Sequence, residues 1–189
     1  MRILTKKENL VACEKVLIFK IKKDFIEKIG NPENYDFKER IKLFEELKKG
    51  AFLKSKKKNL IVDIGKRQIG KILTKYCEIQ SLWDDSGQTY PNKCALGTSD
   101  AGFTNSSTKL NNEVFRKNIA SAQYTMTEFK IISWYTPSDC EGNFREEGIF
   151  FEGTDEKDSG ILFSAITLTA AEGDKTSEEA LLIERTFSL

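Results

Sequence analysis

A series of short strand-like runs from residue 92 to residue 189 is the feature that most constrains the fold of this chain. Residues 121–135 (SAQYTMTEFKIISWY) alternate and are rich in Thr and aromatic residues, as half-buried strands are. Runs at residues 143–153, 160–170 and 178–189 have the same character, and polar loops separate them. Four or more strands joined by short turns predict a mainly β (α+β) chain folded as an antiparallel β-sandwich.

The N-terminal third contains the clearest helix, at residues 37–49 (FKERIKLFEELKK). Its apolar residues recur at helical spacing, and Gly50 follows as a stop. Residues 53–58 (LKSKKK) are typical of a solvated basic connector. We therefore expect two or three short helices in all, an N-terminal extension over residues 1–55 that serves docking or assembly, and a sandwich domain over residues 56–189. The strands after the connector, residues 59–189, are expected to fold alone.

The chain has no histidine. This absence excludes Ser-His-Asp and Cys-His nucleophiles, histidine metal ligands and a histidine general base. The four cysteines are far apart and form no C-x-x-C pair, which favours buried free thiols over a zinc site; they are Cys13, Cys77, Cys94 and Cys140. We expect no metal and no cofactor.

No apolar run approaches the roughly 20 residues of a membrane span. The first ten residues (MRILTKKENL) have no apolar segment and no small-residue cleavage motif, so they do not resemble a signal peptide. We expect no membrane association and a chain that is made and folded in a cytosol.

The net charge of the whole chain is close to zero, but its two parts carry opposite charges. Residues 1–80 carry 21 Lys and Arg against 11 Asp and Glu, a net charge of +10, and residues 81–189 carry 9 against 18, a net charge of −9. Such a chain can dock its basic part on the acidic part of a neighbouring copy. The expected assembly contacts are the connector lysines and one acidic loop: Lys54, Lys56, Lys57, Lys58, Asp155, Glu156 and Asp158.

One candidate constellation lies in residues 108–116 (TKLNNEVFR). The segment predicts a short helix capped by Ser107 or Thr108, with Glu113 and Arg116 three positions apart. A carboxylate and a guanidinium at this spacing can form a structural ion pair.

The strand expected at residues 144–151 places alternate side chains on one face, namely Phe144, Glu146, Gly148 and Phe150. A carboxylate in an apolar face needs a partner, because an unpaired buried charge costs several kcal/mol. The fork of Arg116 fits Glu146 in addition to Glu113. Gly148 would let the backbone of the helix expected at residues 108–116 lie close to the strand.

Five segments, taken in order, carry a resemblance to a known class: residues 59–69 (NLIVDIGKRQI), 95–100 (ALGTSD), 110–116 (LNNEVFR), 146–150 (EEGIF) and 160–168 (GILFSAITL). This order resembles that of tailed-bacteriophage virion proteins of the tail-fibre, tail-collar or minor structural class. In that class an LGtG-like turn precedes LxxExxR, and ExGLF precedes G-x-L-x-A. The sequence departs from the class at Glu147, where an apolar residue is usual.

The resemblance implies a structural component of a virion, in the tail, collar or neck, fibre, or head-auxiliary position. It implies partners among copies of the chain itself and other virion proteins. The chain would be made in the host cytoplasm and located in the virion.

Three alternatives remain at this stage. Glu113 and Glu146 could act as acid and base in glycoside cleavage, but few acids share a groove with aromatic residues, so we expect no enzyme. A host-glycan receptor-binding module could use Trp83 and Tyr90, with sugar binding on a glycan array as the discriminating test. A nucleic-acid-binding accessory protein could use residues 54–75, although nucleic acid is not the partner we expect.

Overall fold

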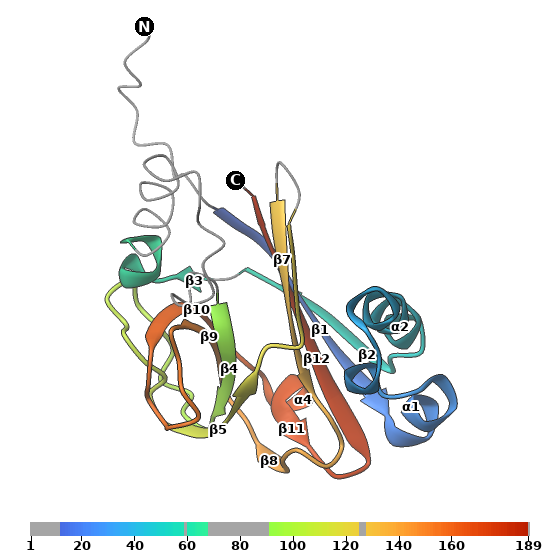
Figure 1. Cartoon of the computed structure of the whole chain (residues 1–189). Helices are drawn as coiled ribbons and strands as arrows, with labels where there is room; N and C mark the ends of the chain where they lie inside the picture. Colours follow the sequence, from blue (N-terminus) through green and yellow to red (C-terminus); the bar gives the residue numbers. More distant parts are fainter. Residues whose placement is uncertain (1–11, 59, 68–90, 125–127, 189) are drawn as a thin grey trace, which may run out of the picture.

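The computed structural model describes residues 12–58, 60–67, 91–124 and 128–188. In this part of the chain, two five-stranded antiparallel sheets face each other, and helices cover the outer face of one sheet (Figure 1). A small two-stranded sheet, β8 (Gly142–Asn143) with β11 (Asp174–Lys175), lies at one end. The expected mainly β, antiparallel sandwich with few short helices is confirmed.

The first sheet has the order β2 (Leu53–Lys57), β1 (Ala12–Lys22), β12 (Glu179–Ser188), β7 (Glu128–Tyr135) and β6 (Ser121–Tyr124). Strand β1 pairs with β12 from Ala12 opposite Ser188 to Lys22 opposite Glu179. Because side chains alternate along a strand, Val16 and Ile18 of β1 both lie in the core between the sheets.

The second sheet has the order β3 (Leu60–Ile61), β10 (Ile161–Thr167), β9 (Glu146–Phe151), β4 (Pro91–Gly97) and β5 (Glu113–Asn118). All its pairings are antiparallel. Its inner face contributes Ile149, Phe151 and Phe163 to the core between the sheets. Rings stack in this core, with Phe163 and Phe187 centroids 4.8 Å apart.

Helices α1 (Lys23–Ile29), η1 (Pro32–Asn34) and α2 (Phe37–Lys49) cover the outer face of the first sheet (Figure 1). The helix expected at residues 37–49 is confirmed. Asp36 caps it by accepting from the backbone N–H of Glu39 at 2.9 Å. Its buried Phe44 meets Trp134 of β7 edge-on, with ring centroids 5.9 Å apart. Helix α4 (Ala170–Gly173) is short, and residues 63–67 are also helical.

The domain boundary expected between residues 55 and 56 is wrong. The expected connector at residues 53–58 contains strand β2, which pairs with β1 from Leu53 to Lys57. Strand β1 itself lies between β2 and β12 inside the first sheet. Residues 12–57 therefore belong to the sandwich, because the apolar side chains of β1 fill both faces of its sheet.

Two element assignments also differ from expectation. The segment expected as a helix at residues 108–116 enters a strand, β5, which starts at Glu113. The run at residues 121–135 contains two strands, β6 and β7, that pair with each other. In both cases pairing with a distant or neighbouring strand overrides the local pattern.

Candidate functional site

The expected pair of Glu113 and Arg116 is present on β5. Arg116 Nε donates to Glu113 Oε1 at 2.6 Å, and Arg116 Nη2 donates to Oε2 at 2.7 Å. Both side chains are almost fully buried. Arg116 also donates to the backbone oxygen of Ser159 at 3.0 Å, and its guanidinium lies 4.2 Å from the ring centroid of Phe150. The pair thus anchors the loop that follows β9.

A β-bulge explains how a strand can hold this pair. Two residues three apart normally point to opposite faces of a strand. Here the register with β4 shifts between Phe115 opposite Leu96 and Glu113 opposite Gly97, so Val114 is an extra residue. Val114 is exposed, and Glu113 returns to the same face as Arg116.

The expected contact between Arg116 and Glu146 is absent. Glu146 is completely buried, and its carboxylate accepts from the backbone N–H of Asn112 at 2.6 Å and of Asn111 at 3.0 Å. The Asn111 side-chain amide adds a third bond at 3.2 Å. Backbone donors satisfy the buried carboxylate without a cation. The carboxylate also occupies the space above Gly97, where a Cβ would collide with it.

Gly148 is closely packed, but against the side chains of Leu110 and Leu162 rather than against the backbone of the expected helix. A Cβ at this position would lie 2.9 Å from Leu110 Cδ2 and 3.0 Å from Leu162 Cδ1. Leu110 belongs to the loop that covers the outer face of the second sheet, where it packs in one cluster with Phe150 of β9. Phe144, expected on the same face, precedes β9 and packs in the core between the sheets instead.

The sequence analysis missed a second buried ion pair. Arg185 of β12 donates from Nη2 to Glu147 Oε2, and both side chains are completely buried between the two sheets. Ser133 donates to Glu147 Oε1 at 2.8 Å. The signal for this pair was Glu147 itself, at a position where the resembled class usually has an apolar residue, and the sequence offered no indication of its partner.

The thiols near this core are poor nucleophiles. Burial raises the pKa of Cys94 to about 12, and the Glu147 carboxylate adds to the rise. Burial likewise raises the pKa of Tyr135 well above its ordinary value and that of Cys140 to about 11. Cys94 is a buried free thiol, as expected, and Cys140 is half-buried. The side chain of Cys13 and the whole of Cys77 lie outside the described residues.

Some of the expected assembly residues have partners within the chain. Lys57 binds Glu172 at 2.6 Å, Lys109 binds Asp158 at 3.2 Å, and Lys93 binds Asp155. The Lys93 ammonium lowers the pKa of Asp155. Exposed residues of this set without an ion pair to any described residue are Lys54, Lys56, Lys58 and Glu156. Charge complementarity between the two expected patches is therefore weaker than composition suggests.

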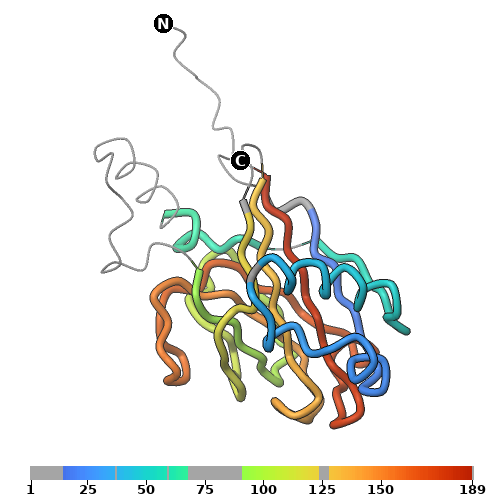
Figure 2. The backbone as a smooth tube through the Cα atoms, turned by 45° about the vertical axis from the view of Figure 1, so that its right-hand side comes forward, coloured from blue at the N-terminus to red at the C-terminus, as the bar shows by residue number. Residues whose placement is uncertain are grey.

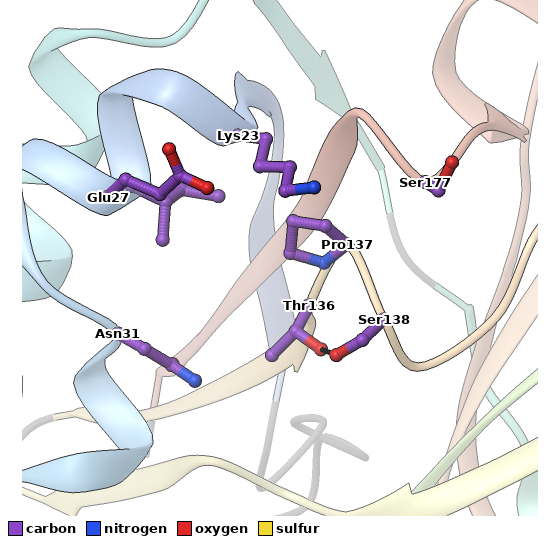
Figure 3. A pocket seen from close by; sticks show the side chains of 8 residues that line it. Lys23, Glu27, Asn31, Thr136, Pro137, Ser138 and Ser177 are labelled. Atoms are coloured by element: carbon purple, nitrogen blue, oxygen red, sulfur yellow. Dashed lines mark hydrogen bonds between the residues drawn. The ribbon is translucent and has the colours of Figure 1, made fainter.

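A hollow of about 300 Å³ lies beside α1. Figure 3 shows Lys23, Glu27 and Asn31 on one side of it and Thr136, Pro137 and Ser138 facing them. The Thr136 and Ser138 hydroxyls bind each other at 3.1 Å, and Asn31 Oδ1 accepts from Trp134 Nε1 at 3.2 Å. Among the described residues, neither hydroxyl has a hydrogen bond to a carboxylate, and the lining offers polar groups to a ligand.

Some of the expected features lie outside the described residues. Trp83 and Tyr90 lie outside them, as do residues 68–75 of the segment 54–75 that a nucleic-acid-binding protein could use. Among residues that the structure describes, no three acidic or cysteine side chains gather where they could hold a metal ion. No described helix is long and apolar enough to cross a membrane.

In comparisons with known proteins, no family model, no curated protein and no solved structure matches this chain.

Proposed function

We propose that the chain is a structural subunit of a bacteriophage-like virion that acts through protein–protein assembly. One observation carries the proposal. The five segments that resemble the virion class contribute to β3, β4, β5, β9 and β10, which are the five strands of the second sheet. Segments that are far apart in the sequence, between residues 59 and 168, therefore contribute to a single sheet. Segments that resemble one class of proteins are expected to lie together in this way if the resemblance reflects a common fold.

The roles of the charged residues support a non-catalytic function. Glu113 and Arg116 neutralise each other under the loop at Ser159, and Glu146 binds the backbone of the loop before β5. These groups hold loops on the outer face of the second sheet. A general acid or base must reach a substrate proton, whereas the side chains of Glu113 and Glu146 are buried against their own partners.

The proposal is tested on particles purified by density gradient from a host that carries the gene. Quantitative mass spectrometry should find peptides of this chain at a constant ratio to the other virion proteins across the particle peak. Immunogold labelling of the same particles would then locate the chain on the tail, neck, fibre or head. Recovery of the chain only in the particle-free fractions would overturn the proposal.

A further inference from the structure

Strand β2 carries a row of exposed lysines on one side. Lys54 and Lys56 lie on β2 and alternate with half-buried residues, so their side chains share a face about 6.7 Å apart along the strand, and the exposed Lys58, directly after the strand, continues the alternation. None of the three forms an ion pair with another described residue. The lysine row is therefore an uncompensated line of positive charge on a regular backbone.

The inner side of β2 is held in place. Lys57 binds Glu172 at 2.6 Å and donates to the backbone oxygen of Thr167 at 2.7 Å. The Ser55 hydroxyl donates to the same carboxylate. The backbone of β2 also pairs with β1 over five residues. These contacts fix the strand and point the lysine row outward.

Strand β2 is also an edge. It is the end strand of the first sheet, and no described strand pairs with its other side. Figure 2 shows this segment at the periphery of the molecule, outside β1. An edge strand presents backbone N–H and C=O groups to which another chain can add.

The positive charge of the lysine row indicates which kind of chain can bind at this edge. A second copy of β2 pairing antiparallel with the first would place lysines opposite lysines, and like charges directly opposite each other destabilise a strand pair. A strand with alternating carboxylates would instead meet each lysine with an opposite charge. Single-stranded nucleic acid fits less well, because it needs stacking aromatics beside the cations. The exposed Phe52 before β2 already contacts Lys22, whose ammonium lies 4.8 Å from its ring centroid.

We propose that the edge of β2 binds an acidic, extended segment of a partner protein, which adds as a further strand of the first sheet. Backbone hydrogen bonds supply the pairing, and the lysine row selects carboxylates at alternate positions of the partner. The inference rests on the proposed assembly function, for which it names the chemistry of the partner.

The probe is a fluorescent synthetic peptide of alternating Glu and Thr, with an alternating Lys and Thr peptide as its control. Binding is measured by fluorescence anisotropy on the full chain. The variant Lys54→Glu/Lys56→Glu/Lys58→Glu should weaken it about tenfold or more, since three opposite-charge pairs become repulsive. The matched control, Lys28→Glu/Lys38→Glu/Lys42→Glu, changes the same charge at exposed lysines of α1 and α2 and should bind as the wild type does. If the β2 variant does not fold, the Lys→Gln triple variant replaces it.

Two further arms separate strand addition from simple attraction. A peptide N-methylated at alternate residues keeps its charge but cannot complete the ladder, so it should not bind, and amide hydrogen exchange in β2 should slow only with the unmodified peptide. Equal binding of the N-methylated peptide, tighter binding of single-stranded DNA, or no binding at all would each overturn the proposal. The last result would mean that the lysines only protect the edge from aggregation. These outcomes leave the particle experiment unaffected, so the two proposals fail separately.

Discussion

Arg185 on β12 and Glu147 on β9 form an ion pair that joins the two sheets, with neither side chain exposed to solvent. Ile183 and Phe187, on the same strand as Arg185, belong to the apolar core between the sheets. Ser133 and Tyr135 donate to Glu147. A buried pair of this kind adds little net stability, but removing one partner leaves a buried charge without compensation. The pair therefore penalises any packing of the sheets that separates the two residues.

The first prediction concerns this pair. We expect Arg185→Met to lower the free energy of unfolding by about 3–5 kcal/mol, because Glu147 stays buried without its cation. The double variant Glu147→Gln/Arg185→Met should recover much of the loss, since it removes both charges and keeps an acceptor for Ser133. Urea unfolding followed by circular dichroism measures both. A double variant as unstable as the single one would attribute the loss to packing rather than to the unpaired charge.

The second prediction concerns Arg116. Replacing it with Ala leaves Glu113 buried without its bidentate partner and frees the backbone oxygen of Ser159. We expect a loss of about 3–5 kcal/mol in the free energy of unfolding. Arg116→Lys should lose less, because it keeps the charge but not the two parallel bonds. A loss well below about 1 kcal/mol in the alanine variant would indicate that solvent screens the pair.

The third prediction concerns pH. Burial alone would raise the pKa of Glu172, but hydrogen bonds from Lys57, Ser55 and Thr169 outweigh it and hold the pKa below its ordinary value of 4.5. A carboxyl whose pKa is lower in the folded state stabilises the fold above its unfolded pKa, and this stability is lost as the pH falls through the folded value. We therefore expect the melting temperature to fall as the pH drops below 4.5.

The variant Glu172→Gln isolates this contribution. It should be less stable than the wild type at neutral pH, and its melting temperature should fall less steeply in acid. Glu179, whose pKa is also lowered, keeps a background slope in both proteins. The matched control is Glu46→Gln on the exposed side of α2, which should retain the wild-type slope. Parallel acid profiles for Glu172→Gln and the wild type would contradict the assignment.

The sequence predicted those features that depend on local pattern. The 37–49 helix follows from helical spacing and from its cap. The pair of Glu113 and Arg116 was expected as a structural contact on a helix, whereas the structure forms it on a strand through the bulge at Val114. The alternating runs at residues 143–153, 160–170 and 178–189 predict strands because their side chains meet a core on at least one face. Gly148 was expected to be closely packed because a glycine has no side chain to keep a neighbouring segment away.

Features that depend on long-range pairing could not be predicted in this way. Arg185 and Glu147 lie 38 positions apart, and nothing in either local segment indicates the other. The helix expected before Arg116 fails because β5 gains pairing with β4, and the bulge at Val114 has no local signature. A cationic partner was expected for Glu146 because the sequence shows only which side chains are present. The backbone N–H groups of Asn111 and Asn112 bind its carboxylate instead, and their position depends on how the loop folds.

The last prediction corrects the expected independence of residues 59–189. Deleting residues 1–55 removes all of β1 and most of β2, so β12 loses β1 along its whole length and keeps only β7 as a neighbour. The apolar residues of β1, including Val16, Ile18 and Ile21, would leave voids on both faces of the sheet. We expect this truncated chain to show no cooperative unfolding transition by circular dichroism, because each buried aliphatic side chain lost removes about 2–5 kcal/mol. The matched control begins at residue 12, retains every described strand and should unfold cooperatively. Cooperative unfolding of residues 56–189 alone would contradict the prediction, because it would mean that β7 and β12 form a stable sheet without β1.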